Sequence, residues 1–459
     1  MRLIALFSAA LVIAGCAREA PEPAPPEAAA PITEVPYYAL PAAEADEPYE
    51  EPAPFLVPET FTLKSAPADL HVFLNGERIN PVSAAPADGL RDFEIDRAGM
   101  LSFRAAGYRT IEHHSSALPV RNGIVGIKLE VEGGLLQLRG EYATGWQPKS
   151  AFFSPDGRRV FLPLLGQHGI DVFRRTGDVL EFERRLRVPG SGASGFVEAF
   201  CDARRRELWV SNMEKNTVHI FDLDTLDYKT SISTGGVFPK VIAQNPEGTI
   251  TVVSNWVSRD VSVFDSEKKE LLRRIPVGGI PRGMAFSSDG SLLYTAIFDE
   301  PVIAVVDMAQ NKVTRRFRLY EGAGAARHVI YRNGRLYVSD MLRGTVDILN
   351  ASTGALLRSR RIGPNINTIV LSPDGRYVFA SSRGRNNPDG YTLPGPDFGA
   401  VFMLRAYDLS LVERVWGRNQ PTGLDISPDG RLLVFTDFLD ANLQLYYISQ
   451  QRISEAEQE

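Results

Sequence analysis

The stretch PVGGIPRGMAFSSDGSLLYTAIF, residues 276–298, contains the pattern that decides the fold. Two apolar runs flank a tight Asp289-Gly290 turn, which is the signature of a β-hairpin. The same kind of turn recurs at Asp156-Gly157, Asn333-Gly334, Asp374-Gly375 and Asp429-Gly430. Hairpins of one type that recur along the chain predict a repeat architecture.

The period of the repeat is visible at the ends of three similar strands. Asp222, Asp265 and Asp307 are 43 and 42 positions apart and close VHIFD, VSVFD and IAVVD. Seven such units of four strands, with no helical periodicity between them, predict a β-propeller over residues 133–450. The last unit has only three strands, and GLLQLRGEY (residues 134–142) supplies the missing one. We therefore expect an all-β, seven-bladed ring closed by this strand, followed by a flexible tail, residues 451–459.

The repeats carry a family resemblance. They lack the Trp-Asp and Gly-His marks of WD repeats and the Gly-Gly pairs of kelch repeats, whereas IPVGGIPRGMAFSSDGSLLYTA and the VSN strands resemble the YVTN family of propellers. That family includes YncE-like bacterial envelope proteins. The resemblance implies the propeller fold but leaves the function open, because propellers host many functions.

The N-terminus predicts export. Arg2 precedes the apolar run LIALFSAALVIAG, which is too short for an ordinary membrane span. Its ending, IAGC, resembles the lipobox of bacterial lipoproteins. The resemblance implies removal of residues 1–15, acylation of Cys16 and, with Ala17 next, an outer-membrane anchor facing the periplasm or the cell surface. The alternative is a plain secretory signal that contains a cysteine.

The segment after Cys16 differs in composition from the rest. Residues 16–58 are rich in Pro, Ala and Glu, and they contain nine acidic residues but only one basic residue, Arg18. We expect a disordered linker. Because the linker carries a charge of about −8 and the whole chain has a net charge of −6, the remaining chain is close to neutral or slightly basic. Together with export, this makes nucleic acid an unlikely partner.

Residues 59–132 predict a small β-sandwich-like domain. DLHVFLNGERI contains an Asn75-Gly76 turn, and MLSFRAAGYRTI turns at Ala106 and Gly107. HVFLNGE, LSFRAAGY and GIKLEVE resemble PEGA domains, which are modules of bacterial surface proteins. His113 and His114 are interpreted as solvent-facing residues and not as metal ligands.

A ring of polar residues is predicted at one end of the central channel. The first strand of each blade lines the channel, and Arg282 lies eight residues before Gly290. The same count in each unit, with a one-residue adjustment in two units, gives the predicted collar: Lys149, Glu198, Lys240, Arg282, Arg327, Asn367 and Thr422. Four cations against one carboxylate favour an anionic ligand. The alternative is that these residues merely line a water-filled channel, with Glu198 bridging two neighbours.

A second set of positions follows the second strand of each blade on the same face. It reads Leu165, Met213, Trp256, Phe298, Met341, Arg383 and Phe438. The apolar members either pack blade against blade or form a rim for a peptide, glycan or protein. Arg383 opens the insertion RGRNNPDGYTLPGPDFGA, where Arg385, Asn386, Asn387 and Tyr391 are candidate ligand contacts.

The sequence offers little support for catalysis. No metal site, cofactor motif or catalytic residue is assigned, and Cys201 is interpreted as a core residue. His168 and His219 have neither metal spacing nor a nucleophile partner. The only acid/base set for a lactone hydrolase is Glu198, Arg327 and His328.

We therefore expect a monomeric, lipid-anchored envelope protein with a non-enzymatic propeller. Its ligand would be an anionic cell-wall component, a glycan or an envelope protein. A lactonase-like hydrolase is the alternative, and nucleic-acid binding is a minor one.

Overall fold

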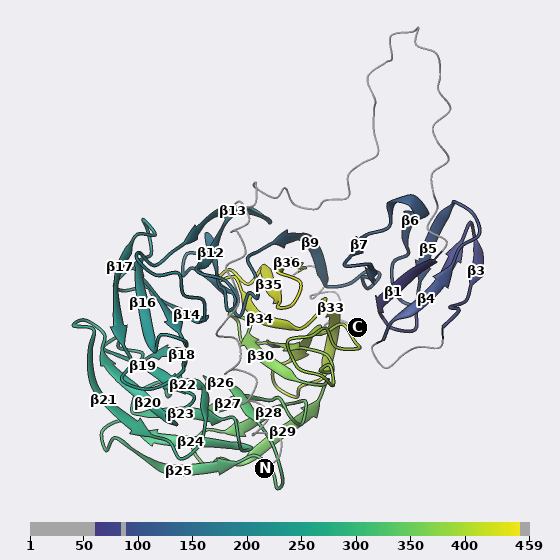
Figure 1. Cartoon of the computed structure of the whole chain (residues 1–459). Coiled ribbons are helices and arrows are strands. Elements are labelled where there is room, and N and C mark those ends of the chain that lie inside the picture. The colour runs from purple at the N-terminus through teal and green to yellow at the C-terminus, as the bar shows by residue number, and fades with distance from the viewer. Residues whose placement is uncertain (1–59, 84–88, 450–459) are drawn as a thin grey trace.

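The computed structural model describes residues 60–83 and 89–449 (Figure 1). The signal segment, Cys16, the linker up to Pro58 and the C-terminal tail lie outside the described residues. Over the described ranges, no helix has the length and apolar character needed to cross a bilayer.

The small N-terminal domain consists of two four-stranded sheets, in the orders β4-β1-β8-β7 and β3-β2-β5-β6. The hairpins predicted at Asn75-Gly76 and Ala106-Gly107 are confirmed as the β2–β3 and β5–β6 pairs. Leu63, Val72 and Phe103 belong to the core that the two sheets share. The elements are β1 (Thr60–Ala66), β2 (His71–Leu74), β3 (Glu77–Ile79), β4 (Arg91–Glu94), β5 (Met100–Arg104), β6 (Ile111–His114), η1 (Ser115–Ala117), β7 (Val120–Arg121) and β8 (Ile124–Lys128).

The remaining described residues form seven four-stranded antiparallel sheets, the blades of the predicted propeller (Figure 1). The innermost strands of blades 1 to 7 are β10 (Phe152–Phe153), β14 (Phe196–Asp202), β18 (Pro239–Gln244), β22 (Pro281–Phe286), β26 (Ala326–Arg332), β30 (Ile366–Leu371) and β34 (Pro421–Ile426). The second strands are β11 (Arg159–Pro163), β15 (Glu207–Asn212), β19 (Ile250–Asn255), β23 (Leu292–Ile297), β27 (Arg335–Asp340), β31 (Tyr377–Ser382) and β35 (Leu432–Asp437).

The two outer positions complete each blade. The third strands are β12 (Ile170–Thr176), β16 (Thr217–Asp222), β20 (Asp260–Asp265), β24 (Val302–Asp307), β28 (Thr345–Asn350), β32 (Ala400–Arg405) and β36 (Asn442–Ile448). The outermost strands are β13 (Val179–Leu186), β17 (Tyr228–Ser233), β21 (Glu270–Pro276), β25 (Lys312–Arg318), β29 (Leu356–Arg361), β33 (Leu411–Trp416) and β9 (Leu136–Ala143).

The ring closes through β9, the only outermost strand that precedes its blade in the chain. β9 pairs antiparallel with β36, so the N-terminal strand completes blade 7. This confirms the predicted closure by residues 134–142. Tyr142 of β9 is buried, and its hydroxyl oxygen accepts a hydrogen bond of 3.1 Å from the Leu180 amide of blade 1. The closing strand therefore also ties the last blade to the first.

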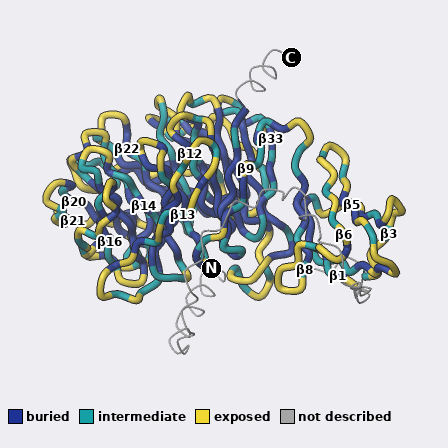
Figure 2. The backbone as a smooth tube through the Cα atoms, turned by 90° about the horizontal axis from the view of Figure 1, so that it is seen from above, coloured by how far each residue is buried: buried dark blue, intermediate teal, exposed yellow. Residues whose placement is uncertain are grey.

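The second and third strands of the blades are mostly buried, whereas outermost strands such as β17 and β29 are largely exposed (Figure 2). Every residue of β31 is buried, whereas every residue of β29 is exposed. β29 carries Arg358, Arg360 and Arg361, and charged side chains on an edge strand disfavour pairing with another chain.

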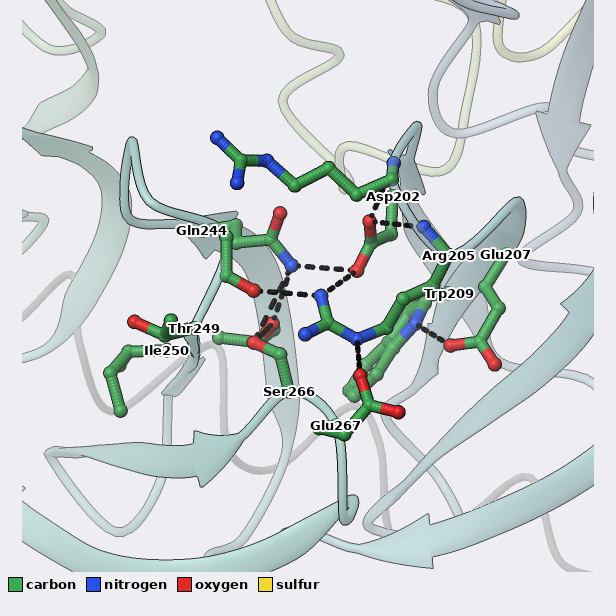
Figure 3. A network of polar contacts seen from close by, with 12 residues as sticks. Asp202, Arg205, Glu207, Trp209, Gln244, Thr249, Ile250, Ser266 and Glu267 are labelled. Carbon is green, nitrogen blue, oxygen red and sulfur yellow. Dashed lines mark hydrogen bonds and ion pairs between the residues drawn. The ribbon is translucent and has the colours of Figure 1, made fainter.

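Polar contacts reinforce the apolar packing between blades. Between blades 2 and 3 (Figure 3), Arg205 donates to the Asp202 carboxylate over 3.0 Å and to Glu267 over 2.8 Å. Gln244 of blade 3 donates to the same Asp202 carboxylate over 2.9 Å. A buried carboxylate needs such partners to offset its lost hydration. The network therefore fixes the two blades against each other.

The innermost strands approach closely around the axis. A Cβ atom at Gly283 of β22 would lie only 2.7 Å from Cα of His328 in β26. No other residue fits there without a backbone shift. Side chains that begin on neighbouring inner strands are therefore brought to one central region.

Candidate functional site

The predicted collar positions can be compared through strand pairing. In blades 2 to 7 the first residue of the inner strand pairs with the last residue of the second strand, as in Pro281 with Ile297. In blade 1 the corresponding pair is the isolated bridge between Pro148 and Leu164, which lies ahead of β10. The residue that follows each of these first residues occupies the collar position: Lys149, Val197, Lys240, Arg282, Arg327, Asn367 and Thr422. The expectation that seven polar residues share this position is therefore wrong in blade 2, where Val197 occupies it and Glu198 follows.

A β-bulge explains why Glu198 nevertheless joins the collar residues. In blades 2 to 7 the pairing register shifts at the collar, so that two residues of the inner strand oppose one residue of its neighbour. A bulge interrupts the strict alternation of side chains and re-aims them. Val197 and Glu198 are the two bulge residues of blade 2.

Arg282 is buried, with 3% of its surface exposed, and pairs with Glu198 across two blades. The guanidinium Nη2 lies 3.0 Å from the Glu198 carboxylate. Among the described residues, the buried Nη1 of Arg282 has no hydrogen-bond partner. The single carboxylate therefore uses only part of the donor capacity of this guanidinium.

The two lysines of the collar have weaker partners. Lys240 Nζ lies 2.8 Å from the Met213 sulfur, 4.6 Å from the centroid of the Phe238 ring and 5.7 Å from that of Trp256. Lys149 Nζ lies 4.5 Å from the centroid of the Phe438 ring. Sulfur and aromatic faces stabilise an ammonium group less than a carboxylate does.

Burial and mutual repulsion act on these cations. Burial lowers the pKa of Lys149 and Lys240 well below the ordinary lysine value, and neighbouring arginines lower it further. The pKa of Arg327 is lowered in the same way, by burial and by Arg282 and Arg383. Glu198 is the carboxylate that opposes these shifts for Lys240 and Arg327.

The structure adds Arg383 to this group. Arg383 is buried and donates to the side-chain oxygen of Gln420 and, over 3.5 Å, to the Tyr391 carbonyl. Burial lowers its pKa to about 10. The positive charge of Arg383 lowers the pKa of Lys149 and of Arg327. We call Lys149, Lys240, Arg282, Arg327, Arg383 and Glu198 the cationic cluster.

The second predicted set lies directly beside this cluster. Each member donates its backbone N–H to the loop that leads into the inner strand, as Trp256 does to Phe238 over 2.9 Å. The Trp256 and Phe298 rings lie 4.6 Å apart between centroids, and Phe438 is fully buried. Leu165, Met213 and Met341 follow the same backbone pattern. The apolar members of this set thus surround the buried cations at this end of the ring.

The insertion folds back on itself through its own polar residues. Arg385 forms an ion pair of 2.5 Å with Asp397, and the Asn387 amide donates to the Pro394 carbonyl over 2.9 Å. Asn386 is exposed. The Tyr391 carbonyl accepts from Gln420 over 2.5 Å. Arg385 and Asn387 therefore shape the insertion, while Tyr391 holds the residues that position Arg383.

The small domain contacts the insertion and blade 7. Lys64 of β1 is buried and donates to the Gly395 carbonyl over 2.6 Å and to the Asn419 side chain over 2.5 Å. Lys128 of β8 forms an ion pair of 2.7 Å with Glu141 of the closing strand. The small domain thus holds both the insertion and the strand that closes the ring.

Burial shifts the pKa values of His328, His219 and Cys201. His328 Nδ1 accepts from the Ile369 amide over 3.2 Å, and burial with the nearby arginines lowers its pKa to about 3. Burial lowers the pKa of His219 to about 4 and raises that of Cys201 to about 12. No group of three metal-ligating side chains exists within residues 60–83 and 89–449. His114 is exposed and His113 is half-buried.

The burial of so many cations predicts that Lys240→Met stabilises the free protein. Replacing a buried charge with an apolar residue of similar volume is often stabilising, here by about 1 kcal/mol or more. Urea unfolding near neutral pH measures the effect. The gain in stability from Lys240→Met should shrink as pH rises towards the ordinary lysine pKa. Lys240 of the unfolded wild type then loses its proton as well, so folding no longer has to remove it or bury its charge.

The matched control is Lys312→Met, which replaces an exposed lysine on β25. This control should change the free energy of unfolding by less than about 0.5 kcal/mol. A clear loss of stability in Lys240→Met alone would show that Lys240 has a structural partner and would contradict this account.

Comparison with known proteins agrees with this architecture. Residues 299–454 match the family model described as "Lactonase, 7-bladed beta-propeller". The chain is 35% identical to antigen Lp49 of Leptospira interrogans over 333 residues, which cover 70% of this chain and 71% of that protein.

More distant relatives share parts of the chain. The seven-bladed beta-propeller protein Rv1057 of Mycobacterium tuberculosis is 27% identical over 29% of this chain and 35% of its own length. Protein NirF of Pseudomonas aeruginosa is 27% identical over 36% of this chain and 34% of its own length. A chain of the mitotic checkpoint complex crystal structure shares the fold alone, with a TM-score of 0.55, 14% identity and coverage of 68% of this chain and 92% of that one. The chain therefore belongs to the lactonase-type family of seven-bladed β-propellers to which antigen Lp49, Rv1057 and NirF are related.

Proposed function

We propose that the protein is a lipid-anchored bacterial envelope protein whose propeller binds an anionic ligand at the cationic cluster without transforming it. Candidate ligands are a cell-wall component, an acidic glycan or an acidic envelope protein. The observation that carries this proposal is the clustering of four buried cations and the partly buried Lys149 with a single neighbouring carboxylate, Glu198.

Physical chemistry favours a ligand over a merely structural role. A charge that is buried without a full set of partners costs free energy, and such a cost persists at sites where it serves a function. An anion in the cluster would offset that cost. The water-filled channel considered from sequence explains Glu198 as a bridge to Arg282, but it gives no reason for the additional buried Arg383.

The anchor and the location are part of the same proposal. The IAGC ending supports acylation at Cys16, the YVTN-type repeats support a YncE-like envelope protein, and the two-sheet domain supports a PEGA-like module. The designation of the relative Lp49 as an antigen is in keeping with an envelope location. Nucleic acid stays a minor option because of the predicted export.

The anchor is tested with Cys16→Ser. The wild type should take up a radiolabelled fatty acid in a bacterial host and partition into detergent, whereas Cys16→Ser should be unlabelled and aqueous. Labelling of the variant, or a wild type without label, would contradict the acylation.

The ligand proposal is tested by retention on an anionic cell-wall fraction. Retention of the wild type should weaken as salt rises, because dissolved ions screen the long-range attraction between the net positive cluster and the anionic fraction. Arg327→Met should lose most of the retention while remaining folded.

Arg358→Met, an exposed change on β29, is the matched control and should bind as the wild type does. Equal retention of the Arg327→Met and wild-type proteins would contradict a role for the cationic cluster.

A lactone hydrolase is the second candidate, because residues 299–454 match a lactonase model. The contacts disfavour it. Glu198 is engaged by Arg282, and a His328 imidazole with a pKa of about 3 is a weak base near neutral pH. We expect no turnover across a panel of lactones. Turnover that Glu198→Gln abolishes, and that Arg358→Met leaves unchanged, would replace the binding proposal with this one.

A further inference from the structure

The cationic cluster has an unbalanced charge that limits which anions suit it. Its five cations come from blades 1, 3, 4 and 5 and from the insertion of blade 6, and Glu198 is its one carboxylate. The formal balance is five positive charges minus one, or +4. We propose that this site binds a multivalent oxyanion, an organic molecule or phosphate compound with at least two negative charges. This inference rests on the proposed anion-binding function.

Unsatisfied polar atoms support more than one anionic group. Within the described part of the chain, three buried donors have no partner: Arg282 Nη1, Arg383 Nε and Asn367 Nδ2. Asn367 is completely buried at a collar position. Unpaired buried groups are rare in folded proteins and point to a missing partner. The three side chains start from β22, the insertion and β30, so separated oxygen atoms match them better than one carboxylate does.

The contacts of the lysines support the same conclusion. The ammonium groups of Lys149 and Lys240 lie over the aromatic rings of Phe438, Phe238 and Trp256. Such contacts are worth about 0.5–2 kcal/mol, and an oxyanion is a stronger partner for an ammonium group. The lysines are therefore available to an anion, and the aromatic side chains offer apolar contacts to an organic ligand.

A single negative charge leaves most of the repulsion in place. The other four cations of the cluster, in addition to burial, lower the pKa of Lys149, so each of them repels its positive charge. One bound carboxylate would reduce the balance only from +4 to +3. Each further negative charge on the same molecule neutralises another positive charge of the cluster without a second loss of translational freedom. Affinity should therefore rise steeply with the number of negative charges on the ligand.

Binding should also take up protons. Because burial and repulsion lower the pKa of Lys149 and Lys240 in the free protein, these groups lose protons more readily than free lysine does. A multivalent anion favours the protonated form and raises the pKa values again. Affinity should therefore fall as pH rises, for as long as the ligand keeps its own charge.

Calorimetry on the full chain tests the inference with acetate, succinate, citrate, inorganic phosphate and pyrophosphate at constant ionic strength. Citrate or pyrophosphate should bind at least about tenfold more tightly than acetate. Titrations in two buffers with different ionisation enthalpies should reveal proton uptake. Affinity for citrate should be higher at about pH 7.5 than at about pH 9, because citrate is a trianion at both values and only the protonation of the protein changes.

Two variants locate the binding. Lys240→Met should weaken the binding of citrate or pyrophosphate at least about tenfold and reduce the number of protons taken up. Lys312→Met is the matched control and should behave as the wild type does. Unfolding curves for both variants show whether the variants are folded under the titration conditions.

The outcomes separate this inference from the proposed function. If acetate binds as tightly as citrate and Lys240→Met weakens both, the cluster binds anions but the multivalent inference is overturned. If citrate binds Lys240→Met and Arg327→Met as tightly as the wild type, binding lies elsewhere and the inference is also overturned. If no anion binds and retention on the cell-wall fraction is absent, both proposals fail.

Discussion

The pairing of β9 with β36 is the constraint on which the rest of the structure depends, because it closes seven blades around one axis. Closure brings inner strands that are far apart in the chain close enough for a Cβ atom at Gly283 to meet the backbone of β26. Side chains that would be solvated on an open sheet then share one buried region. Lys149 and Arg327, 178 positions apart in sequence (327 − 149), interact for this reason.

The closed ring can accommodate the cationic cluster because contacts between the blades, and not the cluster itself, stabilise the fold. Apolar clusters lie between neighbouring blades, and networks such as that of Asp202 and Arg205 pair buried charges outside the cluster. The cationic cluster differs from those networks, since Arg282 and Arg383 keep buried donors without partners among the described residues. A stable scaffold that holds a destabilised site is the usual relation between stability and function in binding proteins.

Local sequence signals predict most of the propeller fold, but they predict only some of the residues of the cationic cluster. Regular Asp-Gly turns and the spacing of Asp222, Asp265 and Asp307 predict the blades, and a three-stranded last unit predicts the closing strand. Strand counting places most of the collar. It includes Glu198, which pairs with Arg282 although Val197 occupies the equivalent strand position. It does not place Arg383 among the cations, because that depends on how the insertion folds back. The contacts of Lys64 and Lys128 with the propeller join distant segments and leave no pattern in the sequence.

The most direct test of this account is the titration of the lysine ammonium groups by nuclear magnetic resonance, with Lys149 and Lys240 assigned by substitution. The account predicts that both groups titrate below the ordinary lysine pKa of about 10.4 in the free protein. Addition of citrate should move both pKa values upward. If both lysines titrate with the ordinary lysine pKa, neither burial nor repulsion acts on them. That result would contradict the claim that the charges of the cationic cluster are destabilised in the free protein and stabilised by a bound anion.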